Sequence, residues 1–492
     1  MYKWLPINSK ADLTVLSKVI PSEYDPQTVV KKLSDGISGA VKAILIEYNY
    51  IDKDYRSTYY NFYAKKGKSY NPNCVRLHFF DETVAFDPKA FKLTSQEKDP
   101  TGELNHHYFG YMVLRPTTIA TIGRSIVSPK VRTGASGSLI QARHGVHLLG
   151  YKLEIVGFPS MDQHSDISVC AHVACWGILR HYSECFRSSR EFLTYDITLM
   201  AQQFNPGGLV PSKGLEVSHA ERVFQEAGTF PFLVARAGKK DPAFYRQLHA
   251  YVESGFPLFA ALPSREHAIA VIGYGLKDPD TKPFKKMRYS WDEVKSIVVV
   301  DDNFLPYLSV PHTKSRRPGY CTKDIDSFIV ALPDKIFYPA DAVDKLSPIL
   351  FKLAKALNLP SQNKTLIRYF IATNSTFRKF IRERASEFDP KLIQTIMALP
   401  FAKFIWIVEL ATAEDWAKGQ ISARAVLDAT ASLKDNCPFW LFHSRTAAFV
   451  FDRNLKGADG DPKAIRALKL SGMESTAFSR FDILGRIETK IK

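Results

Sequence analysis

The pattern of apolar and polar positions divides the chain into three parts, and the first alternates apolar runs with polar stretches. The clearest apolar run, residues 43–50, predicts a strand or the end of a helix, and a tyrosine-rich polar stretch follows at 52–63. Two further runs, 75–80 and 108–116, are aromatic and apolar enough to be strands. These segments predict a mixed α/β unit over residues 1–144.

The order of predicted elements changes over residues 145–335. After a strand near 147–157, the pattern predicts helices from Cys170 and near 191–203, 216–227 and 242–254. It then predicts strands at 257–262, 268–274 and 296–301. The layout is one buried helix followed by a small antiparallel sheet. Residues 278–293 are basic and contain proline, which indicates a long exposed insertion.

The last unit, residues 340–492, follows a linker at 333–339. The pattern predicts helices near 342–357 and 364–387, the second ending before Asp389-Pro390. Strands are predicted at 401–410, 422–428 and 439–443. The whole chain is therefore expected to be α+β: a central helix packed on an antiparallel sheet, between a mixed α/β N-terminal unit and an α+β C-terminal unit.

Length and charge limit the classes of function. A chain of 492 residues is too long for one core, in agreement with several units. Lys and Arg exceed Asp and Glu by 66 − 50 = 16, which attracts anionic partners but does not identify any chemistry. The sequence contains neither a GxxxxGK nor a GxGxxG motif, so nucleotide-driven chemistry is not expected. We expect no cofactor and no metal.

Cysteine usage bears on the compartment. The six cysteines are few for this length and form no CxxC pair, which predicts free thiols in a reduced, cytoplasmic protein. No stretch approaches the roughly 18–20 apolar residues of a membrane span, and no signal-peptide core follows the N-terminus. We therefore expect no membrane contact, and the oligomeric state stays open.

The candidate chemistry lies in the central unit. Cys170 begins the predicted apolar helix and follows Gln163 by seven residues, while His267 begins a strand and a later strand ends in Asp301-Asp302. A helix N-terminus and an imidazolium both stabilise a thiolate. Cys, His, Asp and Gln are thus the parts of a thiol nucleophile with its base, orienting carboxylate and oxyanion donor. Taken alone, each of these residues has a structural explanation, such as core packing or capping of a strand end.

Two assignments within this set need comment. Cys175 also lies on the predicted helix, but on its second turn, where the helix dipole has faded, so we expect it to pack in the core. Asp301 and Asp302 cannot be separated by spacing. Neighbours on a strand face opposite ways, so only one is expected to orient His267, and both remain candidates.

Several short segments together resemble a known family. They are 158–163, 170–174, Gly214-Leu215, His267-Ala268, Gly273-Tyr274 and 300–302. This set resembles papain-like cysteine peptidases, nearest the bacterial branch typified by double-glycine leader peptidases, and it covers only the central unit. The resemblance implies a protein or peptide substrate. It also implies Cys170 as nucleophile, His267 as base, Asp301 or Asp302 as orienter and Gln163 as oxyanion donor.

Two other functions remain open. The first is acyl transfer on the same fold, in which an amine resolves the thioester. The second is a basic scaffold or nucleic-acid-binding protein with an inactive papain-like unit. The tyrosine-rich stretch 48–70 can in principle stack on single-stranded nucleic acid, but a solvated face over packed aromatic rings is the more common arrangement. The basic loop 314–318 is suited either to an acidic substrate or to a solubilising surface, and we favour the surface.

Overall fold

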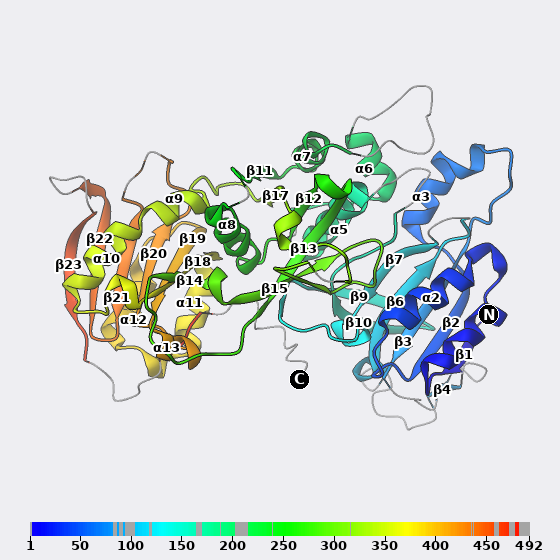
Figure 1. Cartoon of the computed structure of the whole chain (residues 1–492), viewed down its shortest axis with the longest axis horizontal. Coiled ribbons are helices and arrows are strands. Elements are labelled where there is room, and N and C mark those ends of the chain that lie inside the picture. The colour runs from blue at the N-terminus through cyan, green and yellow to red at the C-terminus, as the bar shows by residue number, and fades with distance from the viewer. Residues whose placement is uncertain are drawn as a thin grey trace.

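The computed structural model describes residues 2–81, 86–87, 92–93, 104–117, 121–163, 170–186, 188–201, 215–238, 240–314, 316–433, 435, 437–456, 462–471 and 478–481. Three large sheets with their helices follow one another along the long axis, from blue through green to red (Figure 1). Nearly all neighbouring strands in them run antiparallel. The chain is therefore α+β.

The N-terminal sheet has five strands in the order β1-β2-β3-β6-β7. They are β1 (Tyr2–Pro6), β2 (Ala43–Tyr50), β3 (Cys74–Phe80), β6 (Tyr108–Leu114) and β7 (Ile122–Val127). Every residue of the central strands β3 and β6 is buried, which requires cover on both faces of the sheet. Two short strands, β4 (Phe86–Asp87) and β5 (Lys92–Leu93), pair separately, and α1 (Leu16–Val19) precedes α2.

Helices on the two faces of this sheet begin at capped residues. Helix α2 (Pro26–Gly36) starts after Asp25, whose carboxylate accepts a 3.3 Å hydrogen bond from the Thr28 amide. Helix α3 (Lys53–Asn61) occupies the tyrosine-rich stretch. Tyr55 and Tyr63 of that stretch are buried in a core cluster beneath the sheet, so these two rings pack inside the protein.

The central unit places a long buried helix, α5 (Cys170–Cys185), on a sheet in the order β11-β17-β12-β13-β15-β16. The strands are β11 (Phe230–Ala235), β12 (Leu258–Leu262), β13 (His267–Leu276), β15 (Val294–Val300), β16 (Leu308–Pro311) and β17 (Ser327–Leu332), with β8 (Ser138–Leu139) paired to β13. Helices α6 (Thr194–Met200), α7 (Val217–Glu226) and α8 (Pro242–Glu253) complete it. The helices and strands predicted from 170 to 301 are present with small shifts in their ends.

One prediction near the start of this unit is incomplete. In place of a single strand near 147–157, the chain forms a hairpin of β9 (Ala142–Leu148) and β10 (Tyr151–Gly157). Leu149 and Gly150 have positive φ angles of 50° and 87° at its two-residue turn, a geometry that tight hairpins require. The boundary expected at residue 144 thus falls inside β9.

The C-terminal unit is a sheet in the order β14-β18-β19-β20-β21-β22-β23. Its strands are β14 (Arg288–Tyr289), β18 (Leu366–Thr373), β19 (Phe404–Ala411), β20 (Ala423–Asp428), β21 (Phe439–Ser444), β22 (Ala447–Lys456) and β23 (Pro462–Lys469). Its helices are α9 (Ala340–Lys345), α10 (Ser347–Ala356), α11 (Asn374–Glu383), α12 (Pro390–Ala398) and α13 (Ala413–Ala417).

Two helix predictions in this unit are wrong. The segment expected as one helix at 364–387 starts as β18 and becomes helical only at Asn374. Its first residues are rich in β-branched and aromatic side chains, and burial against both faces of a central strand selects the extended form. The helix expected at 342–357 is two helices, since α9 ends next to Leu346 and α10 begins beside Pro348.

The sequence pattern predicts that the whole insertion 278–293 is exposed. In the structure only part of it is exposed. Its last part forms β14, which pairs in parallel with β18 and so joins the C-terminal sheet. A buried ion pair reinforces this junction, with Arg368 Nε 2.6 Å from Glu253 Oε1 of α8. The central and C-terminal units therefore share both strand pairing and a buried charge contact.

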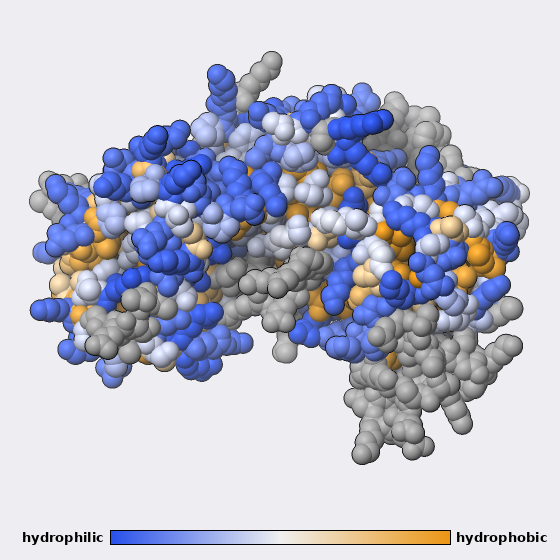
Figure 2. All heavy atoms as spheres, turned by 60° about the horizontal axis from the view of Figure 1, so that its bottom comes forward, coloured by the Kyte–Doolittle hydropathy of each residue, from blue (hydrophilic) through white to orange (hydrophobic). Residues whose placement is uncertain are grey.

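Hydrophilic residues cover most of the face seen in Figure 2, with hydrophobic residues showing in smaller areas between them. Within the described ranges, no helix combines the length and the apolar character that crossing a bilayer requires.

Candidate active site

The fold presents Cys170 at the start of the buried central helix. Cys170 is the first residue of the 16-residue helix α5 and is half-buried, whereas every residue from Ala171 to Tyr182 is buried. The backbone N–H groups of a helix start favour negative charge nearby. Cys175 is fully buried, and burial raises the pKa of its thiol, so it packs in the core, as the sequence indicated.

His267 is fixed by a tight connection between two strands. It is the first residue of β13 and pairs with Leu262, the last residue of β12. Residues 263–265 form a single 3-10 turn between them, and Glu266 has a left-handed φ of 49°. Because α5 packs on β13, this end of the strand lies next to the helix that carries Cys170. The His267 side chain is 13% exposed.

Asp301 and Asp302 reach His267 from the neighbouring strand. Ala270 pairs with Val300, so the antiparallel register carries the chain after Val300 toward His267. His267 Nε2 lies 3.1 Å from Asp301 Oδ1 and 3.8 Å from Asp302 Oδ1. Both carboxylates therefore lie near the histidine, and Asp301 is the nearer of the two. Strand β15 ends at Val300, so the alternation of faces does not extend to these two residues.

The two carboxylates differ in environment. Asp301 accepts hydrogen bonds from the Asn303 amide (2.9 Å) and the Tyr320 hydroxyl (2.6 Å). Although burial acts in the opposite direction, these bonds and His267 hold the pKa of Asp301 below its ordinary value. Burial and the Asp301 charge raise the pKa of Asp302 to about 7. Asp301 is therefore the ionised partner of His267, and Asp302 titrates near neutral pH.

His267 itself is held in its charged form. Burial lowers its pKa, but Asp301, Cys170 and Asp302 outweigh burial and raise the pKa to about 10. At neutral pH the ring is thus an imidazolium in contact with both the thiol and the carboxylate.

The structure also brings in residues that the sequence did not indicate. Lys32 of α2 contacts the Asp162 carboxylate and donates a 2.7 Å hydrogen bond to the backbone oxygen of Asp302. The Tyr320 ring lies 6.3 Å from the His267 ring, centroid to centroid, in an edge-on arrangement. Lys32 is separated from Asp302 by 270 residues, so no local motif could have revealed it. Asn303 directly follows Asp301 and Asp302 in the sequence, so its place near the site could have been predicted.

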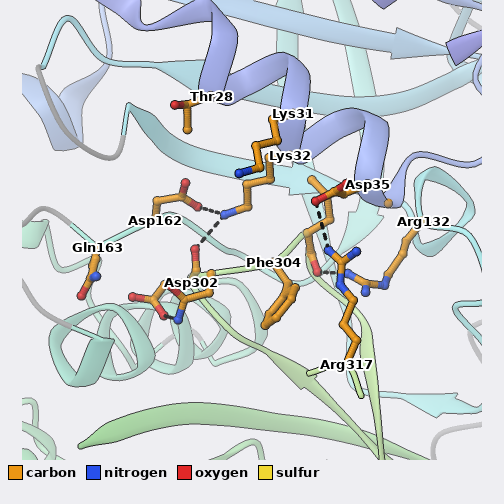
Figure 3. Close-up of a pocket in the computed structure, with 13 residues that line it drawn as sticks. Thr28, Lys31, Lys32, Asp35, Arg132, Asp162, Gln163, Asp302, Phe304 and Arg317 are labelled. Atoms are coloured by element: carbon orange, nitrogen blue, oxygen red, sulfur yellow. Dashed lines mark hydrogen bonds and ion pairs between the residues drawn. The ribbon is translucent and has the colours of Figure 1, made fainter. Parts of the chain in front are cut away.

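Gln163 lies on the wall of a pocket that reaches Asp302. The pocket runs between α2 and the chain after Asp301, and Figure 3 shows Gln163 and Asp302 on the same side of it. Residues 164–169, between Gln163 and Cys170, lie outside the described residues. The fold thus gathers Cys170, His267, Asp301 and Asp302 directly, whereas Gln163 lies on the wall of a pocket that Asp302 also lines.

The same side chains are also a possible metal-binding set. One ligand atom each from His267, Asp301 and Asp302 lies within 4.8 Å of the others. Nitrogen and carboxylate oxygen donors of this kind suit zinc and related ions. A metal ligand must be a neutral imidazole, so a metal ion would have to displace the proton of this ring to bind it.

The order Cys, His, Asp along the chain and the helix-on-sheet setting are the features on which the resemblance to papain-like peptidases depends. No protein-family model matches the sequence, and no curated protein matches it.

Proposed function

We propose that this protein is a papain-like cysteine peptidase that hydrolyses peptide or isopeptide bonds. The Cys170 sulfur, as a thiolate, attacks the carbonyl carbon and forms a C–S bond. The tetrahedral intermediate then collapses, the C–N bond breaks, and the proton of the His267 imidazolium passes to the leaving amine. Water, deprotonated by the now neutral His267, attacks the thioester, the C–S bond breaks, and the carboxylic acid leaves while the Cys170 thiolate and the His267 imidazolium are restored.

The observation that carries this proposal is the position of His267. One half-buried ring contacts both Cys170 and Asp301 and is protonated at neutral pH. An imidazolium beside a thiol at a helix N-terminus is the environment that stabilises a thiolate. Asp301 favours the charged ring and fixes its orientation, while Tyr320 and Asn303 hold the carboxylate.

Gln163 is proposed as the oxyanion donor. Its side chain lines the pocket next to Asp302, close to the acid side of the site. A side-chain amide can donate to the oxygen that becomes negative in the tetrahedral intermediate, and the backbone N–H of Cys170 can supply a second donor. Removal of one such donor lowers kcat by roughly a hundredfold to a thousandfold in comparable hydrolases.

The flanking units fit a role in access to the site. Helix α2 of the N-terminal unit supplies Lys32 to the acidic end of the site, so this unit forms part of one wall. All six cysteines are free thiols, which suits the reducing cytosol, and we propose that the protein works there.

Selective alkylation tests the proposal. The full-length protein is treated with iodoacetamide near neutral pH, and the labelled thiols are mapped by mass spectrometry over time. We expect fast labelling of Cys170, loss of that labelling in His267→Ala, and slow labelling of Cys185. Cys185 is the matched control because it is exposed, yet burial of its sulfur and Glu184 raise the pKa of its thiol to about 11.

The outcomes separate the alternatives. Equal, slow labelling of Cys170 and Cys185 would contradict a thiol active site. If Cys170 labels fast, product analysis with a peptide and an added amine distinguishes hydrolysis from acyl transfer, because a transferase leaves a conjugate. Salt-sensitive binding to nucleic acid that persists in Cys170→Ala, without fast labelling in the parent protein, would favour the scaffold function.

A further inference from the structure

The pocket lined by Gln163 extends from Asp302 of the candidate site toward Arg132 and Arg317. Its volume is about 310 Å³, at the small end of the roughly 300–1,000 Å³ typical of ligand pockets. In the view of Figure 3, Gln163 and Asp302 lie toward one end, Arg132 and Arg317 toward the other, and Phe304 between them. A pocket of this size beside an oxyanion donor suits one substrate side chain or chain end.

The charges of the pocket fall into pairs with a positive surplus. Lys32 contacts the Asp162 carboxylate, and Arg317 Nη2 lies 3.4 Å from Asp35 Oδ2. Asp302, the third carboxylate, has a pKa raised to about 7 by burial and Asp301, so near neutral pH it carries only part of a negative charge. The cations beyond these pairs therefore face little negative charge inside the pocket.

Arg132 and Lys31 are those cations. Among the described residues, no carboxylate lies within ion-pair distance of either side chain. Arg132 is half-buried and donates a hydrogen bond to the Leu305 backbone oxygen, which fixes the direction of its guanidinium. Burial and the neighbouring Arg317 lower the pKa of Arg132 to about 10, and together they outweigh the charge of Asp301, which acts in the opposite direction. Lys31 is exposed on α2 at the rim.

Resting on the proposed function, we propose that this pocket is a specificity subsite for a carboxylate of the polypeptide substrate, with Arg132 as its anchor and Lys31 at its rim. A planar guanidinium binds a carboxylate through two parallel hydrogen bonds, a geometry that a lysine does not offer. The carboxylate is either an Asp or Glu side chain or the C-terminus of the chain. The loop 314–318, for which the sequence favoured a solubilising surface, contributes Arg317 to this wall.

The test measures binding separately from turnover. Full-length Cys170→Ala protein is titrated against fluorescein-labelled, C-terminally amidated hexapeptide pools with Glu or Gln fixed at one position, and anisotropy is recorded. We expect the Glu pool to bind about tenfold tighter than the Gln pool at one position. Pools with a free C-terminus and no internal acid distinguish the chain end from a side chain as the source of the carboxylate.

Variants assign the preference to the pocket. Arg132→Gln should reduce the Glu preference to about twofold or less, and Arg132→Lys should restore it only in part. Lys130→Gln is the matched control, because this exposed cation lies two residues away and does not line the pocket. If Arg132→Gln does not fold, Lys31→Gln on the exposed rim should still weaken the Glu preference about threefold.

Three results would overturn the subsite. The first is equal binding of the Glu and Gln pools at every position, together with no preference for a free C-terminus. The second is an equal loss of the Glu preference in Arg132→Gln and in Lys130→Gln. The third is tighter binding of a phosphoserine pool than of the Glu pool. The parent protein is alkylated in parallel. A preference for Glu without fast Cys170 labelling would support the subsite and contradict the peptidase function. Fast labelling without a carboxylate preference would support the peptidase function and contradict the subsite.

Discussion

The Tyr320 hydroxyl donates a 2.6 Å hydrogen bond to Asp301 Oδ2, while the other oxygen of the same carboxylate lies 3.1 Å from His267 Nε2. Asp301 is thus held on both sides, and both its side chain and the Tyr320 ring are buried. A carboxylate clamped in this way keeps its charge and its direction. Tyr320 therefore acts on the thiol only through Asp301 and His267, as a positioning residue.

Tyr320→Phe should lower the rate of Cys170 alkylation at neutral pH by about tenfold, because a hydrogen bond to a charged group contributes roughly 1.5–3 kcal/mol. The variant should also move the alkaline limb of the pH–rate profile about half a unit to one unit higher, since an Asp301 carboxylate without this hydrogen bond is more basic and attracts the His267 proton more strongly. Tyr60→Phe, at an exposed tyrosine, is the control. A slower rate with an unshifted profile would indicate a purely structural role.

Asp302 makes stability depend on pH. Its pKa is raised from 3.8 to about 7, so the folded protein binds this proton more tightly than the unfolded chain does. The contribution of protonated Asp302 to the free energy of unfolding is therefore fully present below about pH 4 and is lost as the pH rises through about 7. Asp302→Asn cannot ionise, so it should be more stable than the parent protein at pH 8, by on the order of 1–3 kcal/mol.

Chemical denaturation at pH 5 and pH 8 measures this difference. The advantage of Asp302→Asn should grow between the two values. Asp278→Asn, at an exposed aspartate of the insertion, should show no such growth. An advantage that is the same at both pH values would mean that Asp302 is already ionised throughout the range.

Lys32 connects the N-terminal unit to the site. Its side chain and that of Asp162 are only 11% and 12% exposed, so removal of the cation leaves a carboxylate with little water around it. Lys32→Met should destabilise the protein by about 2–4 kcal/mol at pH 7. The loss should be smaller at pH 5, because burial already raises the pKa of Asp162 and the acid can take up a proton.

A double-mutant cycle isolates this ion pair. Lys32→Met combined with Asp162→Asn should recover at least about half of the loss, since the unpaired charge is then gone. Lys31→Met, at the exposed neighbour on α2, should change the free energy of unfolding by less than about 0.5 kcal/mol. Additive losses in the double variant would show that Lys32 stabilises the fold through its stem and the Asp302 backbone oxygen alone.

Much of the central unit could be predicted because its elements are local and strongly patterned. The apolar run after Cys170 and the strand from His267 are continuous in sequence and appear as α5 and β13. The prediction failed at 366–373, where cover from both sides of a sheet, invisible in one sequence, selects a strand. It also failed to separate Asp301 from Asp302, since their difference arises from Tyr320 and Asn303 and from burial.

Other members of the site were out of reach of sequence reasoning. Lys32 and Arg132 come from the N-terminal unit, and their partners lie 130 or more residues away along the chain. Such contacts depend on how α2 and the following sheet dock against the central unit. A single sequence shows a basic residue at each position and gives no sign of which ones face the site.

The metal-free thiol site proposed above and a metal-binding role for His267, Asp301 and Asp302 predict different responses to Zn²⁺ and to EDTA. With the pKa of His267 near 10, a metal ion must displace a proton to bind the ring. Added Zn²⁺ should therefore block Cys170 alkylation only weakly. Its apparent affinity should fall about tenfold for each unit of pH from 10 down to 7, and more steeply below 7, where Asp302 also takes up a proton. EDTA should leave the alkylation rate of the purified protein unchanged. If EDTA instead abolished the reactivity of Cys170 and stoichiometric Zn²⁺ restored it, the three side chains would be metal ligands and the thiol would owe its reactivity to the ion.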